Sequence, residues 1–113
     1  MTPCRSLLFV PGHRDKLLDK ALTLPADGVI LDLEDAVPAQ EKPLARTKAR
    51  DYAARLPGRC WIRVNAPDSP HHEEDLRATA DATGLVGFMV PKADTVAQVQ
   101  ALDAKLAALE AAH

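Results

Sequence analysis

The sequence predicts an α/β fold built on a parallel sheet, and two observations lead to that prediction. Four short apolar runs rich in branched and aromatic residues recur along the chain, at 6–10, 28–33, 60–65 and 86–90. They are near-continuous rather than alternating, which is typical of strands buried on both faces of a parallel sheet. Segments of helical period separate them, and such alternation indicates parallel strands joined by right-handed crossovers.

The first two helices are predicted from apolar residues that share a face. Four follow the first strand: Leu17, Leu18, Ala21 and Leu22. Five follow the second strand at helical spacing: Ala45, Ala49, Tyr52, Ala53 and Leu56. Pro43 suits the first turn of the second helix, where a missing N–H loses no hydrogen bond. Pro57 and Gly58 end that helix.

Two further helices follow the third and fourth strands. Glu73 and Glu74 begin the third helix, where the helix dipole favours acidic side chains. Leu76 and Ala80 face inward, and Gly84 is the expected stop. The fourth helix is capped by Asp94 or Thr95 and carries its apolar face on Val96, Val99, Leu102, Leu106 and Leu109.

Four strand–helix units in 113 residues form one domain, residues 1–113, with about 28 residues in each unit. A complete (β/α)8 barrel takes roughly 250 residues, so the chain has the length of about half of one. The alternative is a small, open, doubly wound sheet. Such sheets often carry a glycine-rich phosphate loop after the first strand, whereas this chain has Pro11-Gly12-His13-Arg14.

Composition excludes several classes of function. The net charge is −2, and the charged residues are spread along the chain, which gives no electrostatic case for binding nucleic acid or an acidic membrane. The start of the chain has no long apolar region typical of a signal peptide. Cys4 and Cys60 form no metal-binding spacing and are expected to be reduced thiols, with a single disulfide as the alternative. We therefore expect a cytoplasmic protein without membrane or nucleic-acid partners.

The candidate site lies where the strands end, because a parallel barrel gathers its chemistry at their carboxyl ends. Asp32, Glu34 and Asp35 follow the second run, and carboxylates this close need a cation or hydrogen-bond donors to stay ionised together. Magnesium would suit direct or water-mediated contact. The other interpretation is a capped turn with solvated acids. Asp32 favours a site, because it lies within an apolar run where an unpaired acid is costly.

Arg63 is embedded in the third apolar run, between Ile62 and Val64. A buried guanidinium needs a partner, and its fork matches a carboxylate or an enolate-like pair of oxygens. An internal salt bridge to Asp32 or Glu34 is the other interpretation, and both can hold before substrate arrives. Asn65 either orients Arg63, binds substrate or serves the turn.

The remaining polar residues are less informative. Lys92 after the fourth strand either meets an anionic ligand or is a solvated lysine. His13 lies near the site, whereas His71 and His72 are expected in a loop. The second helix has a basic face, for which we favour solvation over contact with the phosphates of a nucleotide-bearing thioester: Lys42, Arg46, Lys48 and Arg50.

Four segments in order resemble one known family. They are Arg5–Gly12, the acidic segment Gly28–Pro38 followed by Glu41-Lys42 and Ala45-Arg46, the arginine strand Ile62–Asn65 with Asp68-Ser69-Pro70, and Val90-Pro91-Lys92. The chain resembles the citrate lyase β-subunit-like group of the HpcH/HpaI aldolase superfamily, which includes malyl-CoA lyases. The resemblance covers essentially the whole chain and implies a (β/α)8 TIM barrel, here as its amino-terminal half of about four βα units.

The resemblance also implies a function. It implies a magnesium-dependent lyase that cleaves or forms a carbon–carbon bond in a 3-hydroxy acyl group linked to CoA or a carrier protein, and a homo-oligomer when complete. The arginine matching Arg63 binds substrate and stabilises the enolate, and Glu34 and Asp35 lie beside the metal and its waters. Asp32, Asn65 and Lys92 are further candidate substrate-binding residues.

One departure from the family affects the metal. The family's two direct magnesium ligands follow the fifth and sixth strands, so they are expected beyond residue 113, and the chain alone is not expected to be an efficient enzyme. Two alternatives stay open: a non-catalytic half barrel that serves as a binding or assembly module, and an aldolase acting on free 2-oxo acids. Relatives of the second kind tend to carry a histidine where this chain has Asp35, which favours the thioester lyases.

Overall fold

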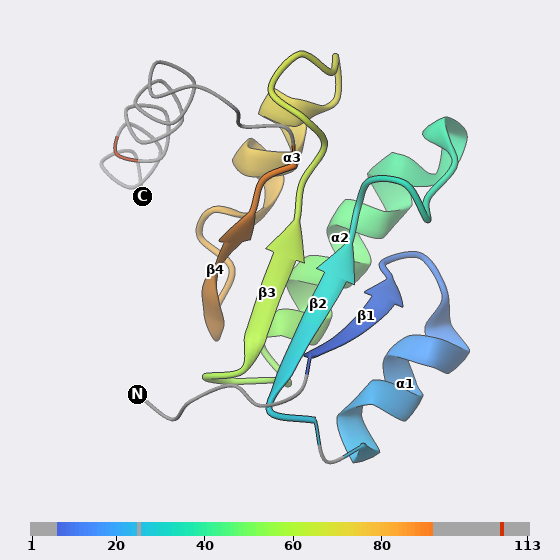
Figure 1. The fold of residues 1–113 in the computed structure, drawn as a ribbon, viewed down its shortest axis with the longest axis vertical. Coiled ribbons are helices and arrows are strands. Elements are labelled where there is room, and N and C mark those ends of the chain that lie inside the picture. The colour runs from blue at the N-terminus through green and yellow to red at the C-terminus, as the bar shows by residue number, and fades with distance from the viewer. Residues whose placement is uncertain (1–6, 25, 92–106, 108–113) are drawn as a thin grey trace.

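The computed structural model describes residues 7–24, 26–91 and 107, which form alternating strands and helices (Figure 1). In chain order the elements are β1 (Leu7–Pro11), α1 (Asp15–Thr23), β2 (Gly28–Asp32), the short 3-10 helix η1 (Ala39–Glu41), α2 (Lys42–Ala53), β3 (Cys60–Arg63), α3 (His72–Thr79) and β4 (Leu85–Met89). The predicted β-α alternation is therefore confirmed over the described residues, and the strand boundaries differ from the predicted ones by one or two residues.

The four strands form one parallel sheet in the order β1-β2-β3-β4. Sequential order means that each crossover turns the same way and places its helix on the same face of the sheet. A doubly wound sheet instead reverses its strand order and carries helices on both faces. The order seen here is that of a (β/α)8-barrel wall, which confirms the predicted fold class.

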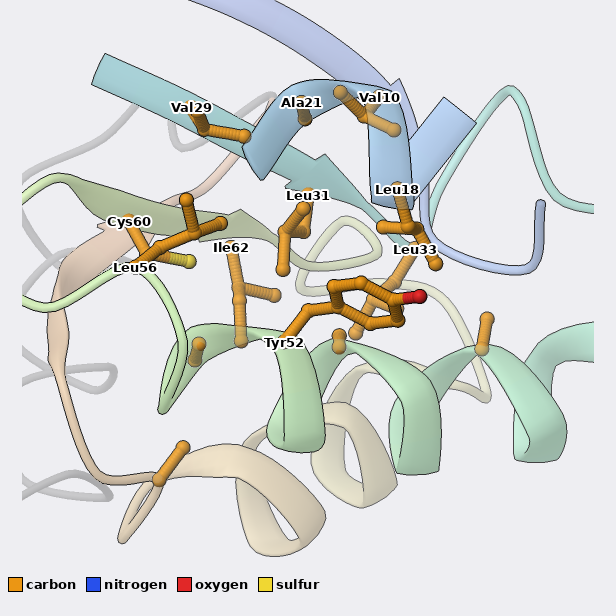
Figure 2. Close-up of a cluster of buried hydrophobic side chains, with 14 of the residues drawn as sticks. Val10, Leu18, Ala21, Val29, Leu31, Leu33, Tyr52, Leu56, Cys60 and Ile62 are labelled. Atoms are coloured by element: carbon orange, nitrogen blue, oxygen red, sulfur yellow. The ribbon is translucent and has the colours of Figure 1, made fainter. Parts of the chain in front are cut away.

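A single apolar core fills the space between the sheet and the helices. Alternate strand residues point into it, with Val29, Leu31 and Ile62 fully buried. In Figure 2, Leu31 and Ile62 point from the sheet toward helix α2, from which Tyr52 points back. Leu18 and Ala21 of α1 join the same core. Burying a side chain of this size contributes about 1.5–3 kcal/mol to stability. This burial fixes which alternate residues of each strand face the helices, and therefore which residues at the strand ends face away from them.

The opposite face of the sheet carries the other set of alternate residues. Phe9 pairs in register with Ile30, which pairs with Trp61. Phe9 is 49% exposed, whereas Ile30 is buried. In a barrel this face looks toward the axis, so it leads to the candidate site at the strand ends.

Pro43 has its predicted role, whereas α2 ends at Ala53 and α3 at Thr79, each before the glycine that was expected to stop it. Pro43 lies in the first turn of α2. Gly58 and Gly84 both have positive φ, 78° and 85°, which glycine adopts without a Cβ penalty. The two glycines therefore form the turns that lead into β3 and β4 rather than the ends of the helices.

Three predictions lie partly or wholly outside the described residues: the fourth helix, Lys92 and Cys4. Cys60 is a buried free thiol, as expected. None of the helices in the described ranges has the length and apolar character needed to cross a membrane.

Candidate functional site at the carboxyl ends of the strands

The register of the sheet brings the predicted residues into one row. Pro11 of β1 pairs with Asp32 of β2, Asp32 with Arg63 of β3, and Arg63 with Met89 of β4. Partners in a parallel ladder point to the same face, and this row belongs to the face opposite the helices. Asp32 and Arg63, 31 residues apart in sequence, therefore meet as side chains.

Arg63 forms a bidentate pair with Asp32 through two parallel hydrogen bonds. Its Nε donates to Oδ1 and its Nη2 donates to Oδ2, both at 2.9 Å. The N–H of Glu34 donates to Oδ1 at 2.9 Å, and the N–H of Ala36 donates to Oδ2 at 3.0 Å. Asp32 is therefore both the partner of the guanidinium and the cap of the turn that follows β2.

This network shifts the pKa of both partners. Burial opposes ionisation of Asp32, but the hydrogen bonds from Arg63, Glu34 and Ala36 together hold the pKa of its carboxyl below the usual value. The hydrogen bond to Asp32 raises the pKa of Arg63, against the smaller effect of burial. Both groups are charged at neutral pH, so the pair presents a fixed dipole at the edge of the sheet.

The other two acids of the turn lie beside this pair. Glu34 Oε1 is 3.7 Å from Arg63 Nε, and the Glu34 side chain is largely buried. Asp35 is exposed, and its charge also helps to raise the pKa of Arg63. The predicted cluster of Asp32, Glu34, Asp35 and Arg63 is thus assembled in space.

An open hollow with a volume of about 330 Å³ lies over the Asp32–Arg63 pair. Its wall is mostly apolar, from Phe9, Val10, Pro11 and Ala36, with Asp32 and Arg63 as its charged part. The Phe9 ring lies under the guanidinium, with Arg63 Cζ 5.2 Å from the ring centre. Asp32 and Phe9 together restrict the guanidinium, which prepares it to meet an anionic group.

Asn65 lies behind the turn rather than in the hollow. Asn65 is 5% exposed, and its Nδ2 donates to Leu33 O at 2.9 Å and to Asp75 Oδ2 at 2.6 Å. Its Oδ1 accepts a hydrogen bond from Lys42 Nζ at 2.9 Å. Asn65 thus joins the end of β3 to the end of β2.

His72 corrects one expectation. It was expected in a loop with His71, but it is the first residue of α3 and is 1% exposed. Its Nδ1 is 2.7 Å from Asn65 O, and because a carbonyl only accepts, Nδ1 carries the proton. Two adjacent histidines do not indicate in the sequence which of them is buried, because that depends on how α3 packs against the sheet.

The basic face of α2 is a second correction, because it is not one solvated surface. Lys42 is 6% exposed, and Arg46 Nε binds the buried Asp75 Oδ1 at 2.8 Å. Lys48 Nζ pairs with Asp15 at 2.7 Å, and Arg50 pairs with Asp81. These four cations therefore already have acidic or carbonyl partners within the chain.

His13 lies close to the site in sequence but not in the hollow. Its Nε2 is 3.1 Å from Glu41 Oε2, and its carbonyl accepts from Lys48 at 3.4 Å. These contacts tie the loop after β1 to η1 and α2. Sequence reasoning did not identify Phe9, Lys42 or Asp75 as part of the site. Of the three, only Phe9 could have been found from the sequence, because it is a large aromatic residue near the end of a predicted strand.

Magnesium requires several oxygen ligands at once. Across residues 7–24 and 26–91, no three side chains of His, Cys, Asp or Glu converge as a metal site. Both oxygens of Asp32 already accept hydrogen bonds. Within the ranges that the structure describes, the carboxylates after β2 therefore do not converge as a set of direct magnesium ligands.

The sheet, its one-sided helices and the charged pair at the strand ends define a (β/α)8-barrel type of α/β protein. The HpcH/HpaI aldolase/citrate lyase family pattern matches residues 5–112, and the chain belongs to this family. The predicted resemblance is thereby confirmed.

Individual relatives support the assignment. A citrate lyase subunit beta-like protein of Deinococcus radiodurans is 40% identical over 103 residues, 85% of this chain and 36% of the relative. A (3S)-malyl-CoA thioesterase of Cereibacter sphaeroides is 38% identical over 106 residues, 88% of this chain and 36% of the relative. The chain thus spans about a third of the length of these curated relatives.

Solved structures agree with the fold. The CitE protein of Mycobacterium tuberculosis in complex with magnesium and acetate superposes with a TM-score of 0.73 at 42% identity, covering 85% of this chain and 39% of that chain. A second CitE structure contains magnesium, acetoacetate and coenzyme A, with a TM-score of 0.68 at 39% identity, covering 85% of this chain and 35% of that chain.

Proposed function

We propose that this chain supplies the arginine-bearing part of the active site of a carbon–carbon lyase, which acts on a 3-hydroxy acyl thioester of the citryl-CoA or malyl-CoA type. The observation that carries the proposal is the Asp32–Arg63 pair, which is joined by two hydrogen bonds and lines the hollow beside Phe9. Family membership and the citrate lyase name of the D. radiodurans relative support the same reaction class, and the name of the C. sphaeroides relative supports a malyl-CoA substrate.

The proposed reaction breaks the bond between C2 and C3 of the acyl group. The C3 hydroxyl loses its proton and becomes a carbonyl, which releases a 2-oxo acid. The electron pair of the broken bond moves to C2 and forms a thioester enolate, which then takes up a proton to give the shortened thioester. Negative charge develops on the enolate oxygen, where a fixed cation is most effective.

Arg63 is the group we assign to that charge. Its Nε and one Nη2 hydrogen bind Asp32, and a guanidinium carries three further N–H donors. We propose that these donors bind the enolate oxygen or a substrate carboxylate. Asp32 holds the guanidinium of Arg63 in one orientation. Asn65 supports the turn after β2 through its hydrogen bonds and does not contact the substrate. Lys92 remains a proposed contact for an anionic part of the substrate.

Magnesium is the proposed cofactor, since CitE structures from M. tuberculosis contain it. When bound, such an ion polarises a carbonyl oxygen. Glu34 and Asp35 are proposed to contact it through water, with the direct ligands beyond residue 113. CoA-linked or carrier-linked acids are the proposed partners, and a homo-oligomer is the proposed state of the complete protein.

The test joins this chain to the remaining carboxyl-terminal part of the D. radiodurans relative and assays malyl-CoA and citryl-CoA with magnesium. Lyase activity yields a 2-oxo acid and acetyl-CoA, whereas thioester hydrolysis, suggested by the C. sphaeroides relative, yields free CoA thiol. Arg63→Ala should lower kcat/KM by at least about 100-fold. Arg77→Ala, which removes an exposed arginine paired with Glu74 on α3, should leave it unchanged.

Three outcomes would overturn the proposal. Release of free thiol without a 2-oxo acid would make the protein a thioesterase. Turnover of free 2-oxo acid adducts in preference to thioesters would make it an aldolase. Full activity in Arg63→Ala would remove the assigned role of the guanidinium.

A further inference from the structure

We propose that Lys42 is a positioning residue that holds the acidic turn after β2 in place for the chemistry assigned to Arg63, and this inference rests on the proposed function. The turn runs from Leu33 to Ala36 and carries Glu34 and Asp35. Lys42 belongs to α2, so it reaches the turn from behind and does not itself line the hollow.

Three contacts of the Lys42 ammonium group carry the proposal. Nζ donates to Leu33 O at 2.8 Å, to Glu34 O at 3.1 Å and to Asn65 Oδ1 at 2.9 Å. An ammonium group has three hydrogens, so its whole donor capacity is used on the two strand ends. Leu33 and Glu34 follow β2, and Asn65 follows β3. Lys42 therefore joins the two strands whose last residues are Asp32 and Arg63.

The same turn is held from its other side by Asp32. That carboxylate accepts the N–H groups of Glu34 and Ala36, while Lys42 binds the carbonyls of Leu33 and Glu34. The turn is thus held by an anion at its N–H groups and by a cation at its carbonyls. This arrangement limits rotation of the peptide groups of the turn, and it therefore fixes the positions of the Glu34 and Asp35 side chains.

Burying a lysine costs free energy because its ammonium group loses its hydration. Burial lowers the pKa of Lys42, although the nearby charges of Asp75, Asp32 and Glu34 oppose that shift. Lys42→Met takes the donor away from the two carbonyls of the turn and from Asn65 Oδ1, and a buried acceptor left without a partner destabilises the folded state. Lys42→Met is therefore expected to release the turn at a measurable cost in stability.

The experiment uses the joined protein of the activity assay and measures two properties of Lys42→Met. Amide hydrogen exchange at Glu34 and Ala36 should become at least about tenfold faster, because the turn opens more often. The kcat should fall at least about tenfold with KM within about threefold, because a small displacement of the site impairs the reaction more than binding. Lys42→Gln, which keeps N–H donors but shortens their reach, is expected to behave in the same way and serves if Lys42→Met does not fold.

Lys20→Met is the matched control, since Lys20 is an exposed lysine in the last turn of α1, a different helix from the one that bears Lys42. It should change neither exchange nor kcat. Unchanged exchange in both Lys42 variants would overturn the inference, as would faster exchange with unchanged kcat. An inactive parent protein would refute the proposed function instead, and the exchange result would still decide whether Lys42 holds the turn.

Discussion

Arg63 and Asp32 illustrate how one side chain serves both fold and site. Asp32 accepts four hydrogen bonds, two from the guanidinium and two from the backbone of the following turn. Buried carboxylates with this many donors stay ionised, because each hydrogen bond favours the charged form. The pair therefore stabilises the strand end and presents a cation to the hollow at the same time.

Asp32→Asn should lower stability by about 1–3 kcal/mol at pH 7, because it removes charged hydrogen bonds from a buried group. The folded pKa of Asp32 lies below its unfolded value, so its stabilising effect is present above the unfolded pKa of about 4. The effect is lost as pH falls through the folded pKa. Urea unfolding at pH 7, 5, 4 and 3 should show the two proteins converging below pH 4.

Asp15→Asn is the control for that series, because Asp15 is exposed and pairs with Lys48 at the surface. A difference between wild type and Asp32→Asn that stayed constant down to pH 3 would contradict the assigned pKa direction.

At the scale of elements, the turns that join α2 and α3 to the strands determine where the strand ends fall. Gly84 precedes β4 with φ of 85°, and a Cβ built there would lie 2.4 Å from Ala53 O, in the last turn of α2. Gly58 has a similar φ of 78°, but a Cβ there would meet nothing within 4 Å. Gly58 is therefore required only for its backbone conformation, whereas Gly84 is required both for its backbone conformation and for close packing against α2.

Gly58→Ala should cost about 1–2 kcal/mol, the price of a Cβ in the left-handed region. Gly84→Ala should cost clearly more, because the backbone of α2 must also move. Urea unfolding of both variants measures the two free energies. Equal losses would contradict the close approach of β4 to the end of α2.

At the scale of the whole molecule, one core supports the strands and the helices together. Cys60 begins β3 and is fully buried in that core. Burial raises the pKa of its thiol to about 12, against the smaller opposing effect of Arg59. The thiol can therefore react only when the core opens.

Cys60 should label slowly with a thiol reagent in the native protein at pH 8, in a Cys4→Ser background that leaves Cys60 as the sole cysteine. Labelling should accelerate with urea along the unfolding transition, since an unfolded thiol regains a pKa of about 8.5. Immediate complete labelling without denaturant would show that β3 is not packed as described.

Much of the fold was predictable because its signals are local. The apolar runs and Pro43 act within a few residues and predicted the strands and the start of α2. Gly58 and Gly84 marked turns correctly, but α2 and α3 end before them. Part of the candidate site was predictable as well. Arg63 and Asp32 are charged residues inside apolar strands, so each required a partner, and the salt bridge between them was one of the two interpretations considered.

The partners of Lys42, Asn65 and His72 were not predictable. Lys42 was assigned to a solvated face because lysine is usually exposed, and no pattern along the chain marks it as buried. Its contact with Asn65 spans 23 residues of sequence, and the contact of Asn65 with Asp75 needs α3 packed behind β3. Such pairs form only after the helices have packed.

The sequence alone therefore determined the α/β alternation, the polar strand ends and the family, because these depend on residue type and spacing. Only the tertiary structure decided which alternate residues of each strand face the helices, which cations are buried and what lies behind the acidic turn. The physical reason is that strand register and helix packing bring together residues distant in sequence, and burial then determines which hydrogen bonds must form.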